Sequence, residues 1–158
     1  MEGYKNGSDI LVKLPDGAIG HCTTHSITYN TETKDVAVKP LASVAASATA
    51  GRFKGKRIVG LAIQIKVSGM KFYSETESGF KKILAKWAQG QSVQASAFER
   101  GQDANPYLTG NFVISELTET NPAADDATYD ATLDLDGDPT VLDASKIDLL
   151  ATGSSQQE

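Results

Sequence analysis

The sequence has 158 residues, 22% of them charged and 40% hydrophobic, which is the composition of a folded domain rather than of a disordered chain. Its 20 acidic and 15 basic residues give a net charge of −5. This argues against a protein that coats nucleic acid, because phosphate binding depends on clusters of lysine and arginine. No run of about 18 apolar residues is present, so we expect no membrane-spanning helix, and the single Cys22 excludes an internal disulfide.

The first third of the chain predicts a hairpin followed by a long irregular segment. Asp9–Leu14 is expected to form a strand, Pro15–Gly17 a turn, and Ala18–Asn30 the returning strand. Residues 31–56 show no strong period and are rich in small side chains. A stretch of this length without regular structure is usually functional or disordered, so we expect a long extended loop here.

A strand and a helix are predicted next. The odd positions from Val59 to Val67 are apolar and alternate with polar residues, which indicates a half-buried strand. Ser74 resembles a helix N-cap and Gly90 a C-cap. Between them, apolar residues recur at helical spacing, which predicts one amphipathic helix whose apolar stripe packs on a sheet. The residues of this stripe are Phe80, Ile83, Leu84 and Trp87.

The remaining chain again alternates with a period of two. The predicted segments are strands at Ser92–Phe98, Tyr107–Thr118 and Ala127–Asp136, a helical turn at Asp143–Leu150 and a disordered tail at Ala151–Glu158. The sequence therefore predicts a mainly β protein, an antiparallel β-sandwich or barrel with one packed α-helix and a long extended loop. We expect one domain over residues 1–150 and a disordered tail over residues 151–158.

One candidate metal site fails on geometry. His21, Cys22 and His25 carry good zinc ligands. On a strand, however, His21 and His25 stand roughly 13 Å apart at about 3.3 Å per residue, and Cys22 points to the opposite face. One ion does not reach all three, so no metal site is predicted here.

Two further motifs fail on spacing. Gly51–Arg57 has three residues between its glycines where a phosphate-binding loop has four, and no serine or threonine follows Lys56. Asp134–Asp138 places its glycine fourth where a calcium-binding EF-hand loop has it sixth. With no metal site, no cofactor site and no catalytic triad, the sequence predicts a protein that is not an enzyme.

Several strings, in this order, make the chain resemble the major tail tube protein of long-tailed, non-contractile bacteriophages. They are Gly7–Thr23, Ile27–Val36, the strand Arg57–Ile63 after a basic stretch, the helix after Ser74, and Ala127–Gly137 with the turn that ends at Thr140. The resemblance covers most of residues 7–141.

The resemblance implies a β-sandwich that forms hexameric rings, and rings that stack into a tube through which DNA passes without specific binding. It implies no cofactor and no membrane. The partners would be further copies of the chain and the other tail proteins, namely the tape measure, the tail terminator and the initiator complex. The protein would reside in the virion, after synthesis and assembly in the cytoplasm of the host bacterium.

The resemblance also assigns roles to two groups of residues. Residues 34–56 would form an arm that reaches an adjacent subunit or ring. The inter-subunit contact candidates in and beside this arm are Lys34, Asp35, Lys39, Arg52, Lys54, Lys56 and Arg57. The candidates for lining the lumen, with the outer wall as an equal alternative, are Asp130, Thr132, Asp134 and Asp136.

Alternative functions stay open at this stage. The first alternative is a related tube protein of a contractile tail or of a phage-derived injection particle. A β-sandwich that binds carbohydrate or protein is a second alternative, although such a module usually exposes clustered aromatic residues and this chain has 5 Phe, 5 Tyr and 1 Trp. An enzyme would need a metal or ligand at His21 or at Asp134–Asp138.

Overall fold

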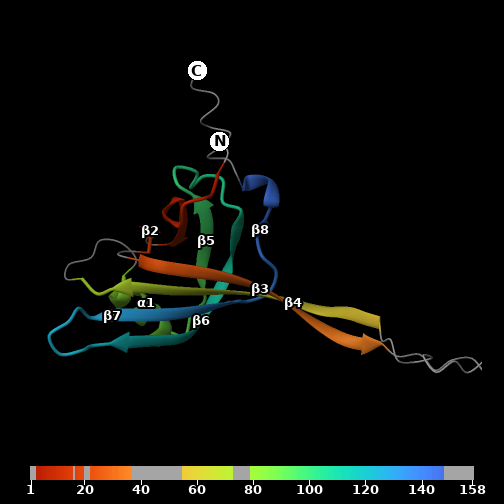
Figure 1. The fold of residues 1–158 in the computed structure, drawn as a ribbon. Coiled ribbons are helices and arrows are strands. Elements are labelled where there is room, and N and C mark those ends of the chain that lie inside the picture. The colour runs from red at the N-terminus through yellow and green to blue at the C-terminus, as the bar shows by residue number, and fades with distance from the viewer. Residues whose placement is uncertain (1–2, 16, 20–21, 37–54, 73–78, 148–158) are drawn as a thin grey trace, which may run out of the picture.

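The computed structural model describes residues 3–15, 17–19, 22–36, 55–72 and 79–147. Figure 1 shows the arrangement of its elements. In chain order they are η1 (Gly7–Asp9), β1 (Ile10–Leu14), β2 (Gly17–Ala18), β3 (Cys22–Val36), β4 (Gly55–Met70), α1 (Phe80–Ala88), β5 (Val93–Glu99), β6 (Leu108–Thr120), β7 (Thr128–Leu135), β8 (Val141–Leu142) and η2 (Ala144–Lys146).

The strands form one antiparallel sheet in the order β2-β1-β5-β6-β7-β4-β3, with β8 also paired to β6. Strand β6 belongs to two layers, because its first part pairs with β5 and β8 and its second part with β7. A register shift between Ile114 and Glu116 marks the irregularity along β6. The front layer is β3-β4-β7-β6, and β5 crosses behind it (Figure 1). The prediction of an antiparallel, mainly β fold with one helix is confirmed.

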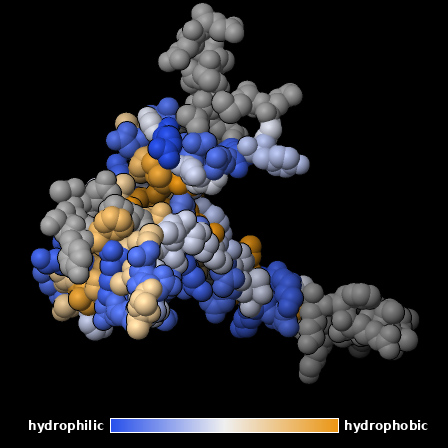
Figure 2. Space-filling model, turned by 60° about the vertical axis from the view of Figure 1, so that its left-hand side comes forward, coloured by the Kyte–Doolittle hydropathy of each residue, from blue (hydrophilic) through white to orange (hydrophobic). Residues whose placement is uncertain are grey.

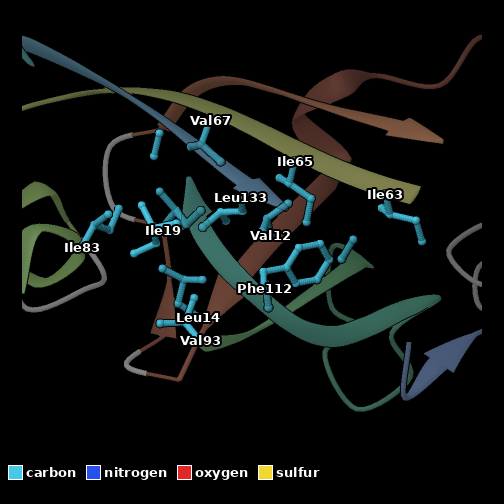
Figure 3. Packing of buried hydrophobic residues seen from close by; sticks show 14 of the residues in the cluster. Val12, Leu14, Ile19, Ile63, Ile65, Val67, Ile83, Val93, Phe112 and Leu133 are labelled. Carbon is cyan, nitrogen blue, oxygen red and sulfur yellow. The ribbon is translucent and has the colours of Figure 1, made fainter. Parts of the chain in front are cut away.

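The core lies between the two layers (Figure 3). Its largest fully buried side chains include Tyr129 and Leu133 of β7, Ile65 of β4 and Phe112 of β6. Burying a large apolar side chain of this kind stabilises the fold by roughly 1.5–3 kcal/mol. The predicted alternation along β7 and along the second half of β4 is confirmed, since the apolar positions there point into this core.

The prediction of a hairpin over residues 9–30 is wrong. The strand that returns after the turn is only Gly17–Ala18, which pairs with Lys13 and Leu14. The long strand β3 pairs instead with β4 along its whole length, and the other neighbour of β1 is β5. Alternation identifies a strand and its apolar face, but it does not identify the partner strand.

Part of the predicted irregular segment 31–56 is strand. Strand β3 continues to Val36 and β4 begins at Gly55, so residues 31–36 and 55–56 belong to the β3–β4 ladder. Residues 37–54 lie outside the described residues, as do Ser74 and the predicted tail at 151–158. The division into one domain and a tail therefore stays a prediction.

Helix α1 differs from the prediction at its start and in its packing. It begins at Phe80 after the N-cap Gly79, and Gly90 follows its C-cap with a positive φ of 65° that favours glycine. Ile83 is buried, and the ring of Phe80 lies 5.9 Å from that of Tyr129.

The prediction that Leu84 and Trp87 pack in the core is wrong, because they are 40% and 52% exposed. The nine-residue helix contacts the sheet along a stripe narrower than its apolar face.

Candidate functional site

The solvent side of the front layer carries mostly polar side chains. Cross-strand pairing aligns Asp130 with Ser68, Thr132 with Lys66 and Asp134 with Gln64, and the same residues of β7 lie opposite residues of β6. Alternation from the buried positions extends this face over the neighbouring strands, with Val113 as an apolar member. We define the polar face by these residues: Thr24, Ser26, Thr28, Asn30, Gln64, Lys66, Ser68, Val113, Glu116, Thr118, Asp130, Thr132 and Asp134.

Side chains of the polar face bond to one another across the strands. The amide of Gln64 donates to the carboxylate of Asp134 at 2.9 Å, and the hydroxyl of Ser68 donates to Asp130. Three carboxylates share this face with Lys66, so its charge is negative. Such a surface attracts water and repels phosphate groups.

Three of the four predicted lumen residues lie together on the polar face: Asp130, Thr132 and Asp134. Asp136 follows the end of β7, and its backbone N–H donates to the carbonyl of Asn111. It therefore lies just beyond the strand that carries the other three residues. Which side of an assembly this face lines stays a prediction.

Both edges of the front layer lack a partner among the described strands. Strand β3 pairs with β4 alone. On β6, the ladder with β5 ends at Phe112, so residues 113–120 pair only with β7. Because successive strands in the order β3-β4-β7-β6 are antiparallel, β3 and β6 run in opposite directions. Each edge presents backbone N–H and C=O groups that another strand would satisfy.

Beyond the body, β3 and β4 continue as a two-stranded ribbon, which we define as residues 30–36 paired with residues 55–62 (Figure 1). The ladder between β4 and β7 reaches only to Gln64, so the ribbon has no third strand among the described residues. A ribbon that projects in this way is suited to contacting another molecule.

Four of the predicted contact residues meet at the end of the ribbon. Lys34 lies opposite Arg57, and Asp35 lies opposite Lys56, with which it forms an ion pair. This end of the ribbon is hydrophilic in Figure 2. The other three predicted residues, Lys39, Arg52 and Lys54, lie outside the described residues.

The ribbon and the adjoining Tyr29 expose large apolar side chains, and one of them, Leu61, belongs to the face that the sequence pattern places in the core. Leu61 is 75% exposed, Ile58 64% and Tyr29 54%. Pairing puts them on one face, because Leu61 and Ile63 oppose Thr31 and Tyr29, and Ile58 opposes Thr33 across a register shift. The expectation that Val59 and Leu61 are buried is wrong, since the second layer ends before it reaches the ribbon.

A groove of about 660 Å³ lies between β1–β2 and β3. Its walls include Ile10, Leu11, Ile27, Cys22 and His25. Burial raises the pKa of the Cys22 thiol, although backbone hydrogen bonds at Thr24 and Ser68 oppose the shift, and burial lowers the pKa of His25. A neutral imidazole and a protonated thiol result near neutral pH.

The described part of the chain contains no cluster of three or more metal-ligating side chains. His21 lies outside it. The predicted calcium-like segment at Asp134–Asp138 is a strand end and turn, in which Gly137 has a φ of 80°. None of the described helices has the length and apolar character needed to cross a bilayer.

Comparison with known proteins identifies the fold. No protein-family model and no curated protein matches the sequence. A chain in the tail of an empty gene transfer agent particle, determined with C6 symmetry, superposes with a TM-score of 0.65 at 18% identity, over 87% of this chain and 98% of that one.

Two more solved structures are similar. The SPP1 tail tube protein gives a TM-score of 0.50 at 12% identity, over 84% of this chain and 76% of that one. A chain of the anti-feeding prophage baseplate gives 0.53 at 8% identity, over 90% and 98%. The fold is therefore that of phage-type tail tube proteins, as the sequence resemblance implies.

Proposed function

We propose that this chain is a structural, non-enzymatic subunit of a phage tail tube, which forms hexameric rings that stack around a lumen for DNA. The observation that carries the proposal is the front layer, a four-stranded sheet with a polar face and two antiparallel edges that no other described strand pairs with. The six-fold symmetry of the particle whose tail chain has the same fold supports the number six.

The edges explain how a ring would close. In a ring all copies have the same orientation, so β3 of one copy meets the residue 113–120 part of β6 of the next copy. These two strands run antiparallel and would form a regular ladder. A head-to-tail contact of this kind produces a ring when its rotation closes. Closure joins the front layers into one barrel and removes the exposed edges.

The polar face would then line the lumen. Asp130 and Asp134, with Glu116 beside them, would repel the phosphates of passing DNA, and the hydroxyl groups would hold water. DNA would slide past without specific binding. The ribbon, with its apolar face and the charges of Lys34, Lys56 and Arg57, would contact an adjacent ring.

The partners would be other copies of the chain and, at the two ends of the tube, the initiator complex and the tail terminator, with the tape measure inside during assembly. The protein would reside in the virion and assemble in the host cytoplasm. A tube of a contractile or phage-derived injection particle is the second candidate, favoured by the similar fold of the anti-feeding prophage chain.

Cross-linking tests the ring contact directly. In a Cys22→Ser background, cysteines at Thr28 on β3 and Thr118 on β6 should be joined between copies by a short bifunctional maleimide, giving a ladder of covalent oligomers up to six. The control pairs Thr28→Cys with Thr132→Cys, which lies on the central strand β7. Chains that remain monomeric, or that cross-link equally in both variants, would contradict the proposed ring.

A further inference from the structure

Two partly apolar surfaces of the body are exposed behind the front layer, one on helix α1 and the other beside the β3 edge. One is the flank of helix α1 that carries Leu84 and Trp87. The other is the groove between β1–β2 and β3, with Ile10, Leu11 and Ile27 in its walls. Exposed apolar groups gathered in this way mark contact sites more often than chance exposure does.

Leu84 and Trp87 lie on the flank of helix α1 that is turned away from β1 and β2. Successive helix residues are 100° apart, so Lys82 and Lys86 lie on one flank of the buried Ile83, and Leu84 and Trp87 lie on the other. Lys82 and Lys86 line a small hollow with Leu14 and Pro15 at the end of β1, and Val93 and Ile114 complete its lining. Leu84 and Trp87 are therefore turned away from β1 and β2, and Figure 1 shows α1 behind the β7–β6 half of the front layer.

The groove lies on the other side, between the β3 edge and β1–β2. Helix and groove are both behind the front layer, on the side opposite the polar face. When the β6 edge of one copy meets the β3 edge of the next, the helix flank of the first copy comes to face the groove of the second. Because the groove lies next to the proposed edge contact, its occupant would be a second copy of the chain.

We infer that Leu84 and Trp87 of one copy pack into the groove between β1–β2 and β3 of the neighbouring copy in the ring. The inference rests on the proposed function and names a second contact for the same interface. Each subunit would then contribute the Leu84–Trp87 flank of helix α1 to one neighbour and its groove to the other neighbour.

The chemistry of the groove suits an indole ring. Its aliphatic walls take the apolar body of the ring, and the hydroxyl groups of Ser8 and Thr23 offer acceptors to the indole N–H. Arg100, whose guanidinium donates to the carbonyl of Ser8 at 2.6 Å, presents a cation that can stack on the ring. Tryptophan is the residue type most often found to dominate the energy of such contacts.

Trp87 is the only tryptophan of the chain, so tryptophan fluorescence reports on the surroundings of this side chain. In the free subunit the indole should emit at the wavelength of an exposed side chain and be quenched by acrylamide. In assembled rings or tubes, verified by electron microscopy, the emission should shift to shorter wavelength and the quenching constant should fall severalfold.

The outcomes separate this inference from the proposed function. Tubes in which Trp87 stays as quenchable as in the free subunit would overturn the inference, leave the proposed function standing, and leave the helix flank to a protein that binds outside the ring. Failure to assemble under any condition, including in the presence of preformed tubes as seeds, would overturn both.

Two variants of helix α1 test the same contact through the concentration that assembly requires. Trp87→Ala should raise the concentration needed for assembly by about tenfold or more, as expected for a dominant interface residue. Lys81→Ala, on the solvent side of α1, should leave it unchanged. Both free subunits should still fold cooperatively, and equal assembly of the two variants would overturn the inference.

A cross-link tests whether Trp87 enters the groove between β1–β2 and β3 of the neighbouring copy. Cys22 is exposed and lines the groove. A bifunctional maleimide should therefore join Trp87→Cys of one copy to Cys22 of the next and produce covalent oligomers. Lys81→Cys should not cross-link, and equal cross-linking of both variants would contradict the placement of the helix.

Discussion

Gly69 of β4 leaves the space that the ring of Tyr129 occupies, and this predicts a specific packing defect. The two residues are direct cross-strand partners on the core side of the front layer. A Cβ atom at Gly69 would lie 2.7 Å from the Tyr129 Oη and 2.8 Å from its Cε1 and Cζ. Ordinary carbon contacts are about 3.5–4.0 Å, so the ring would have to move.

The ring has little room to move. Tyr129 is fully buried and packs against Phe80 at 5.9 Å between ring centroids. Overpacking of a well-filled core costs about 1–3 kcal/mol. Replacing glycine by alanine within a strand returns about 0.5–1 kcal/mol of backbone entropy. We therefore expect Gly69→Ala to lower the free energy of unfolding by about 1–2 kcal/mol.

Urea unfolding of the free subunit, followed by circular dichroism, measures this change. With a slope of about 1–3 kcal/mol per molar urea, the midpoint should fall by roughly 0.5–1 M. The matched control is Gly60→Ala in the same strand, where the added Cβ lies 3.4 Å from the flexible Glu32 carboxylate and should cost nothing. In a Tyr129→Leu background the cost of Gly69→Ala should disappear.

Two results would refute this reasoning. One is a Gly69→Ala subunit as stable as the Gly60→Ala control. The other is an unchanged cost of Gly69→Ala in the Tyr129→Leu background, since the loss would then come from the backbone and not from the ring.

Three further predictions follow from the surface of the molecule. Amide hydrogens along β3 that do not bond to β4 should exchange rapidly in the free subunit and slowly in assembled tubes, and equal exchange in both states would contradict pairing at this edge. The ammonium group of Lys71 hydrogen-bonds Glu119 and lowers the pKa of that carboxyl group, so the stability it confers is full above the ordinary carboxyl range and is lost as pH falls through the lowered pKa. Glu119→Gln should therefore reduce the fall of the urea midpoint at acidic pH. An unchanged fall would show that other groups cause it. Tubes assembled from a subunit with Asp130→Lys and Asp134→Lys should retain DNA at low salt and release it at high salt, whereas tubes that bind no more DNA than wild type would contradict a lumen lined by the polar face.

Local patterns in the sequence predict strands and their apolar faces well. The alternation at Ile63, Ile65 and Val67 and that at Tyr129, Ala131 and Leu133 depend only on which side of each strand is buried. Three of the predicted lumen residues share one face for the same reason, since they alternate with these buried positions on β7.

Strand partners are not visible in such patterns. The turn at Pro15–Gly17 suggests that β1 and β3 pair, yet β1 pairs with β5, more than eighty residues away in the sequence. The partner of each strand is decided by the arrangement of the whole sheet, and a short turn contributes little to it.

The exposed apolar residues were mispredicted for a related reason. Leu61, Leu84 and Trp87 belong to apolar faces that the periodicity identifies, and only the extent of the second layer decides whether a face is covered. In a subunit of a larger assembly, the cover can come from another copy of the chain. The mispredicted positions are therefore those on which the proposed contacts depend.

Cryo-electron microscopy of tubes grown from the purified chain, with preformed tubes as seeds, tests the central claim most directly. We predict six subunits per ring, a continuous inner barrel in which β3 of one copy pairs with β6 of the next, and Asp130 and Asp134 facing the lumen. Rings in which the β3 and β6 edges remain unpaired, or in which the polar face lies on the outer wall, would contradict the account.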